Sequence, residues 1–192
     1  NSRIMLTKQF MAAKVNNVKD YEAKTGGSYF FDNNIWMLLF AGIAGAHMDK
    51  QRKYSRLLQD IRNRDGIIFI SSLILSEYIN RSLRLYYEQW IVSNNKIRAV
   101  TDYKRDYRGS EDYKTALKSV ISEVEDILSI SERRPDDFNS IDINTVLKDM
   151  STDSDFNDSY YVELCDKNKM ILVTDDKDLV NTSKNINIVT YQ

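Results

Sequence analysis

Four acidic side chains in this sequence stand at positions from which they could act together. Asp32 follows a short apolar run, Glu77 lies early in an expected helix, and Asp158 and Asp176 flank the apolar run at 170–173. Carboxylates that share one place repel each other unless a cation or a proton neutralises them. All-oxygen ligation selects hard cations, Mg²⁺ or Mn²⁺, over zinc. Such ions can activate a water and stabilise the leaving oxygen of a phosphodiester.

Alternating strands and helices are expected to bring these acids to one edge of a sheet. The alternation predicts an α/β fold whose sheet is parallel and whose crossovers are right-handed. Asp32 and Asp176 come just after strands, while Glu77 and Asp158 lie early in helices. Ligands of open parallel sheets bind at the carboxyl edge, where these four positions can converge. The expected strands are the short apolar runs at 28–31, 67–70, 170–173 and 186–190.

The length of 192 residues suits one domain with a sizeable core. We expect a helical N-terminal arm at 1–27 and a single α/β domain at 28–192, with a helical insertion at about 84–150. Apolar side chains at helical spacing support these assignments. Helices are expected near 35–47, 48–64, 73–92, 94–107, 112–131 and 141–150, in the segment that begins near Asp158, and briefly after Asp178.

Two of the acids also have simpler interpretations. Asp32 lies between a strand and a helix, and taken alone it fits a helix N-cap slightly better than a site residue. Glu77 lies in an otherwise apolar stretch, where Arg81 at i+4 could pair with it. The interpretation as a site rests on all four acids having equivalent places in the fold, since such a cluster without a cation would cost several kcal/mol.

Composition excludes several other classes of function. The single histidine, His47, excludes multi-histidine zinc chemistry, and no nucleophilic triad or glycine-rich phosphate loop is present. The single cysteine, Cys165, excludes an intrachain disulfide and fits a reducing compartment. No 18-residue apolar run or signal peptide is visible, so we expect a cytoplasmic protein without a membrane segment.

The net charge of −1 hides an uneven distribution. Residues 135–192 contain twelve acidic and five basic side chains, a net −7, so the preceding part carries +6. Basic residues in the expected helix 48–64 fit a solvated face better than a phosphate-binding patch. Bases and aromatics alternate in 103–113, a mixture that can hold a single RNA strand, although a protein-binding surface or a solvated helix is jointly favoured.

Three segments resemble the PIN-domain nucleases, and within them the VapC-type toxins of bacterial toxin–antitoxin pairs. The segments are YFFDNNIW, FISSLILSEYINR and DFNDSYYVELCDKNKMILVTDDKDL, in that order. The resemblance covers about 28–92 and 150–192, and the third segment is the most specific. The chain is longer than compact toxins of this kind, with the excess in the N-terminal arm and in 84–150.

This resemblance implies a parallel sheet sandwiched by helices and metal-dependent endoribonuclease activity. It also implies an RNA substrate, an antitoxin protein as partner and a homodimer. The four acids named above correspond to the residues that hold the divalent ion, Mg²⁺ or Mn²⁺. The supporting residues that it implies are Asn34 and Thr174, with Asp155 and Asp178 as outer acids.

Two other functions remain open from the sequence. A domain of the same fold could bind RNA or a partner protein without cutting, although such a domain would be expected to have lost one of the acids. A receiver-like phosphoacceptor domain is disfavoured, because only Asp32 follows the first strand and no lysine stands after a late strand.

Overall fold

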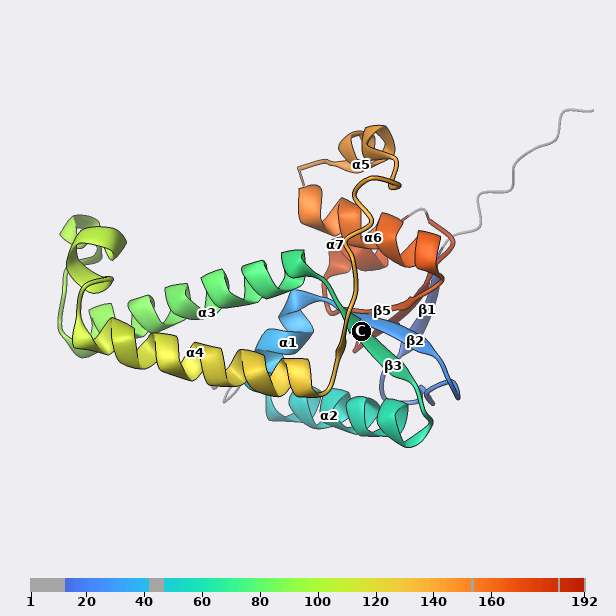
Figure 1. Cartoon of the computed structure of the whole chain (residues 1–192), viewed down its shortest axis with the longest axis horizontal. Helices are drawn as coiled ribbons and strands as arrows, with labels where there is room; N and C mark the ends of the chain where they lie inside the picture. Colours follow the sequence, from blue (N-terminus) through green and yellow to red (C-terminus); the bar gives the residue numbers. More distant parts are fainter. Residues whose placement is uncertain (1–12, 42–46, 153, 183, 192) are drawn as a thin grey trace, which may run out of the picture.

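The computed structural model describes residues 13–41, 47–152, 154–182 and 184–191. Its centre is a six-stranded sheet in which every strand pair is parallel, as the α/β prediction requires. The strands follow the order β1-β6-β5-β2-β3-β4 across the sheet (Figure 1). They are β1 (Lys14–Asn17), β2 (Ser28–Phe31), β3 (Ile67–Ile70), β4 (Glu132–Arg133), β5 (Ile171–Val173) and β6 (Asn187–Thr190).

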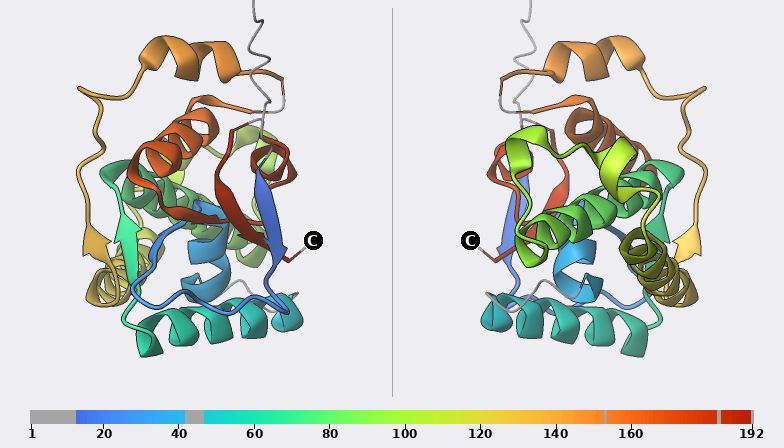
Figure 2. Two further views of the ribbon diagram at one scale, coloured as in Figure 1. Left: turned by 90° about the vertical axis from the view of Figure 1, so that its right-hand side faces the viewer. Right: turned by 90° about the vertical axis from the view of Figure 1, so that its left-hand side faces the viewer.

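Helices cover the sheet from both sides. Helix α2 packs against β3 and helix α6 packs against β5, and these two helices lie on opposite sides of the sheet (Figures 1 and 2). None of the helices in the described residues is long and apolar enough to cross a membrane. The α-helices are α1 (Asn33–Phe40), α2 (Met48–Asn63), α3 (Ser72–Ser93), α4 (Glu111–Ser129), α5 (Ile143–Asp149), α6 (Phe156–Asn168) and α7 (Lys177–Val180).

The central strands form because their apolar runs are covered on both faces. The aromatic side chains of β2 and all three residues of β5 are buried in the main core. Burial of each large apolar side chain stabilises the fold by roughly 1.5–3 kcal/mol. Ser71 caps α3 by accepting a hydrogen bond from the backbone of Ile74, which fixes where α3 leaves the carboxyl edge of the sheet. Helix α6 ends at Asn168, with Lys169 in the left-handed region as its C-cap, just before β5 begins at the opposite edge.

The structure describes only residues 13–27 of the expected helical arm. The apolar residues on which a helix was expected lie outside this part: Ile4, Leu6, Phe10 and Met11. The described part of the arm instead contributes β1, which pairs in parallel with β6 at the edge of the sheet. The backbone N–H of Lys14 donates to Ile186 and that of Val18 to Thr190. This part of the arm therefore belongs to the sheet of the main domain.

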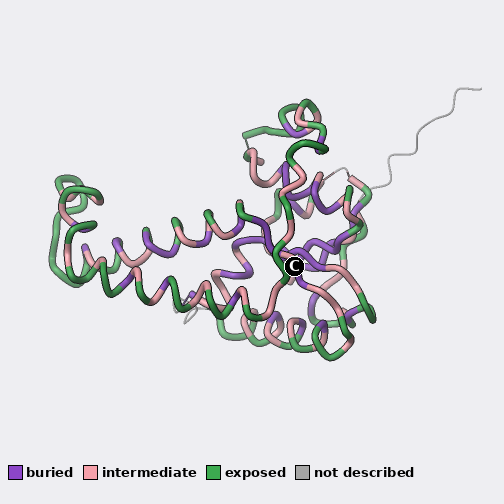
Figure 3. The backbone as a smooth tube through the Cα atoms, in the orientation of Figure 1, coloured by how far each residue is buried: buried purple, intermediate pink, exposed green. Residues whose placement is uncertain are grey.

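The segment 84–150, expected as a helical insertion, contains the second half of α3, then α4, β4 and α5. Helices α3 and α4 extend together away from the sheet, with buried residues on their facing sides (Figures 1 and 3). The helix expected at 94–107 is wrong, because α3 ends at Ser93 with Asn94 as its C-cap, and Asn95 has a positive φ of 50°. A 3₁₀ turn at 98–100 and a π-helical turn at 103–107 follow. Strand β4 was also not expected from the sequence, and it pairs with β3.

Candidate active site

Asp32 both caps α1 and lies at the carboxyl edge of the sheet. Its backbone N–H donates to Val173 at 2.9 Å, which joins the end of β2 to the end of β5. Its Oδ1 accepts from the backbone N–H of Asn33 at 2.6 Å, and its Oδ2 accepts from the Thr174 hydroxyl at 2.8 Å. The side chain is buried, with 6% of its surface exposed. Asp32 is therefore both the N-cap of α1 and a residue of the predicted site position, so the two interpretations of this acid are compatible.

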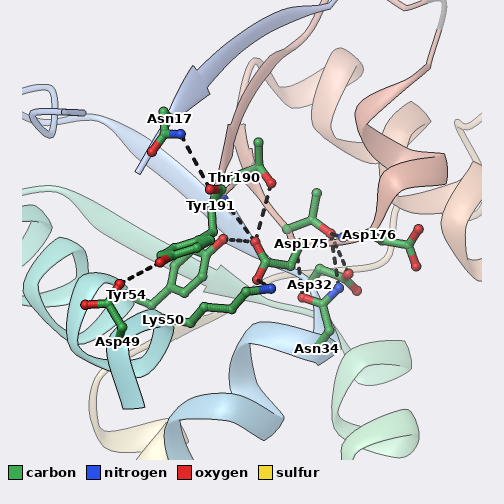
Figure 4. A network of polar contacts seen from close by, with 11 residues as sticks. Asn17, Asp32, Asn34, Asp49, Lys50, Tyr54, Asp175, Asp176, Thr190 and Tyr191 are labelled. Carbon is green, nitrogen blue, oxygen red and sulfur yellow. Dashed lines mark hydrogen bonds and ion pairs between the residues drawn. The ribbon is translucent and has the colours of Figure 1, made fainter. Parts of the chain in front are cut away.

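Thr174 joins the loops that follow β2 and β5. Its buried Oγ1 donates to Asp32 and accepts from the Asn34 side-chain amide at 3.3 Å. The same oxygen accepts from the backbone N–H of Asp176 at 3.0 Å. Figure 4 shows Asp32, Asn34 and Asp176 close together at this edge. The predicted supporting residues Asn34 and Thr174 therefore lie in direct contact with predicted site residues.

Glu77 is held by neutral donors from two other helices. Its Oε1 accepts from the Asn33 amide at 3.0 Å. Its Oε2 accepts from the Tyr161 hydroxyl at 3.0 Å and from the Asn157 amide at 3.3 Å. These three contacts hold the Glu77 carboxylate. Among the described residues, the Arg81 pairing that the sequence also allowed is not formed. Sequence reasoning missed all three donors, because they depend on how α1 and α6 face α3.

Asp158 and Asp176 each lie at the start of a helix near the carboxyl edge of the sheet. Asp155 and Asp158 form a reciprocal capping box at the start of α6: the backbone N–H of Asp158 donates to Asp155 at 3.1 Å, and that of Asp155 donates to Asp158 at 3.2 Å. Asp176 caps α7 by accepting from the backbone N–H of Asp178 at 2.8 Å. The side chain of Asp178 is exposed.

The charges of these acids affect one another. Burial raises the pKa of Asp32 to about 7, with the negative charges of Glu77 and Asp158 acting in the same direction and the hydrogen bonds from Thr174 and Asn33 opposing them. Burial also raises the pKa of Asp158 to about 6, and the charges of Asp155, Asp176 and Glu77 add to this. Asp158 thus lies within electrostatic reach of Asp32, Glu77 and Asp176, which links the four predicted acids into one group.

Asp175 has a different environment from its neighbour Asp176. It accepts hydrogen bonds from the Tyr54 hydroxyl and from the backbone N–H of Tyr191, the latter at 3.0 Å, and it pairs with Lys50 at 3.0 Å (Figure 4). A half-buried carboxylate with these partners ties α2 to the end of β6. Asp175 is therefore part of the framework beside the site.

The donor chemistry of the site fits a hard divalent cation. The side chains are carboxylates, amides and a hydroxyl, and the buried amide oxygen of Asn33, next to Glu77, has no hydrogen-bond partner among the described residues. Within the same residues, no three acidic, histidine or cysteine side chains are grouped closely enough to hold a metal ion as they stand. Hydrogen bonds to neighbouring groups hold the carboxylates instead. Metal binding here therefore requires them to turn toward one another.

Comparison with solved structures shows the class of fold, which is that of PIN-like domains. A chain of VapBC2 from Rickettsia felis, solved bound to a DNA fragment from their promoter, has a TM-score of 0.50 at 15% identity, with 84% of this chain and 98% of that chain covered. PAE2754 from Pyrobaculum aerophilum has a TM-score of 0.47 at 14% identity, covering 85% of this chain and 84% of that one. No family model and no curated protein matches the sequence. The resemblance seen in the sequence is confirmed at the level of the fold.

Proposed function

We propose that this protein is an endoribonuclease that cleaves RNA phosphodiesters with Mg²⁺ or Mn²⁺. The observation that carries the proposal is that Asp32, Glu77, Asp158 and Asp176 all stand around the carboxyl edge of the parallel sheet, with Asp158 influenced by the charges of Glu77 and Asp176. This edge is where parallel α/β folds bind their ligands. A buried carboxylate beside other carboxylates is costly unless a cation or a proton balances it, which favours a cation site.

The residues of the site have distinct roles in this proposal. The four acids hold the ion directly or through water, and the ion when bound supplies a more acidic water and positive charge next to the phosphodiester. Thr174 and Asn34 orient Asp32 and Asp176 through the hydrogen bonds described above. In the same way, Asp155 positions Asp158, and the backbone of Asp178 positions Asp176.

The biological setting is proposed from the same resemblance. The chain would act in the cytoplasm as the toxin of a toxin–antitoxin pair, neutralised by an antitoxin that covers the four acids at the carboxyl edge, and it would form a homodimer. The likeness in fold to a chain of VapBC2 supports this setting. Co-purification with the protein encoded beside it tests the antitoxin, and light scattering tests the dimer.

Substitution of single site acids tests the proposed activity. We expect Asp32→Asn and Asp176→Asn each to lower the rate of RNA cleavage by more than about a hundredfold, because each removes a negative ligand oxygen while the side-chain volume stays the same. Circular dichroism should show an unchanged fold. Asp126→Asn, an exposed acid on α4, is the matched control and should cleave at the wild-type rate. Full activity in either site variant would contradict the proposal.

A second candidate function is a binding module of the same fold that does not cut. The observation that favours it is the saturation of Glu77 by three neutral donors, an arrangement that is stable without an ion. Calorimetric titration with Mn²⁺ separates the two functions. Binding that Asp32→Asn abolishes supports the nuclease, whereas undetectable binding by wild-type protein supports the module.

A further inference from the structure

An open groove of about 430 Å³ runs along α3 past Glu77, from Leu73 to Arg84. Arg81 and Arg84 line it on the α3 side, and Asn157, whose amide donates to Glu77, lines it from α6. The two guanidinium groups are donors that suit an anionic ligand. The groove therefore connects one of the four acids to a basic surface that the proposed reaction has not yet used.

The spacing of the two arginines follows from helix geometry. Arg81 and Arg84 are four and seven residues after Glu77, so all three side chains share one face of α3. A rise of 1.5 Å per residue places them about 6 Å and about 10 Å along the axis from Glu77. A strand whose reacting phosphate lies near Glu77 would therefore present its following phosphates to Arg81 and then Arg84.

Both guanidinium groups are available to a ligand. They are exposed, and among the described residues neither pairs with a carboxylate, whereas Arg64, Arg98 and Arg105 do. Exposed arginines that have no carboxylate partner can bind phosphates without first breaking an ion pair.

Arg84 is also held in place by an aromatic ring. Its guanidinium carbon lies 4.2 Å from the centre of the Tyr103 ring. Tyr103 in turn makes edge contacts with Tyr87 and Tyr113, with ring centres 5.2 Å and 6.3 Å apart. This contact reduces the side-chain entropy that Arg84 would lose on binding. The tyrosines of 103–113 thus pack on one another, on Tyr87 and Trp90 of α3, and on Arg84.

We propose that Arg81 and Arg84 bind successive phosphates of a single RNA strand on one side of the cleavage site, with Tyr103 as a positioning residue for Arg84. That the bound RNA is the substrate of a nuclease rests on the proposed function. An open groove lined by two exposed arginines suits a single strand held by its backbone, with little dependence on base sequence.

Binding measured without cleavage tests the proposal. Fluorescence anisotropy with a labelled oligouridine in EDTA, over a series of salt concentrations, gives both affinity and the number of phosphate contacts. We expect the double variant Arg81→Ala/Arg84→Ala to bind about tenfold more weakly than wild type. The slope of log affinity against log salt should fall by about 0.7 for each arginine removed. Arg62→Ala, an exposed arginine in the last turn of α2, is the matched control and should change neither quantity.

Tyr103 is tested by a double-mutant cycle. Tyr103→Leu should weaken binding in the wild-type background and have no further effect with Arg84→Ala, while Tyr103→Phe should bind like wild type because it keeps the ring. An equal effect of Tyr103→Leu in both backgrounds would contradict a role through Arg84.

The binding and cleavage experiments can fail separately. If wild type does not cleave but binds RNA with the expected dependence on the two arginines, the groove assignment stands and the nuclease proposal fails. If wild type cleaves, the double variant should raise KM and keep kcat. RNA binding that is absent in wild type, or unchanged in the double variant relative to Arg62→Ala, would overturn the groove assignment.

Discussion

At the scale of single residues, one hydroxyl group organises the candidate site. The Thr174 oxygen gives its hydrogen to Asp32 and accepts from Asn34 and from the backbone of Asp176, which uses its full capacity of one donor and two acceptors. The carboxylate of Asp32 and the backbone of Asp176 are therefore fixed relative to each other. Supporting hydrogen bonds of this kind orient the residues of a site, and metal binding then requires only that the carboxylates turn.

The hydroxyl of Tyr161 should matter through Glu77. Tyr161→Phe removes the 3.0 Å hydrogen bond to Glu77 but keeps the ring, whose centre lies 5.4 Å from that of Phe30. We expect kcat for RNA cleavage to fall about tenfold with KM unchanged, because supporting contacts of this kind orient a ligand residue. Tyr160→Phe, whose hydroxyl bonds the backbone of Asp136, is the control. Equal kcat in the two variants would contradict this role.

At the scale of elements, the carboxylate of Asp60 links the N-terminal arm to α2. It accepts from the backbone N–H of Ala23 at 2.7 Å and from the Arg64 guanidinium at 2.8 Å. The hydrogen bond from Ala23, and then the contact with Arg64, lower the pKa of Asp60 below its usual value. The folded state thus favours the charged form more than the unfolded state does.

This link predicts a dependence of stability on pH. Because the folded pKa is lower than the unfolded one, the stabilisation is complete above the unfolded pKa of Asp60 and is lost as the pH falls through the folded pKa. Asp60→Asn should therefore lower the free energy of unfolding at neutral pH, and the difference from wild type should shrink on acidification. Denaturant unfolding at a series of pH values measures it. A difference that does not change with pH would contradict the assignment.

The far end of the α3–α4 pair has a core of its own. Tyr87, Ile91 and Tyr107 form a buried cluster there that is separate from the main core, whereas Ile127, nearer the sheet on α4, belongs to the main core. Two clusters on one helix pair can open independently if each has its own buried contacts.

Truncation of one residue in each cluster tests this independence. Tyr107→Ala should lower the free energy of local opening by roughly 3 kcal/mol and speed hydrogen exchange in 98–113, with the central strands unaffected. Ile127→Ala should instead destabilise the whole domain. Faster exchange in β2 and β5 of Tyr107→Ala would show that the two clusters unfold together.

The elements that the sequence predicted correctly are those with a strong apolar pattern. The strands expected at 28–31, 67–70, 170–173 and 186–190 are present within a residue of their expected bounds. Strand β1 has the sequence KVNN and β4 is Glu132–Arg133, so neither has an apolar run. Both form through backbone pairing at the edges of the sheet, which no side-chain pattern reports.

The candidate site shows the same division. The acids could be located because each stands at the end of a recognisable strand or the start of a helix. The donors to Glu77 could not be located from the sequence. Asn33, Asn157 and Tyr161 contact it only because of how α1 and α6 are rotated about their axes. The structural role of Asp175 also could not be predicted, since it depends on an ion pair with Lys50 of α2.

At the scale of the whole molecule, the fold places basic side chains near an acidic edge of the sheet. The acidic segment 135–192 supplies β5, β6 and α6, while Arg81 and Arg84 of α3 come from the preceding part of the chain, which carries the excess of positive charge. In the proposed function, these two arginines hold the polyanion while a cation neutralises the acids at the reacting phosphate.

The most direct test is cleavage of a mixed RNA pool by purified protein with Mn²⁺, with Mg²⁺ and with EDTA, beside Asp32→Asn. The account predicts cleavage by wild type with either ion, none in EDTA, recovery when the ion is added back, and none by Asp32→Asn under any condition. Cleavage that persists in EDTA, or that Asp32→Asn retains, would contradict a metal-dependent reaction at this edge of the sheet.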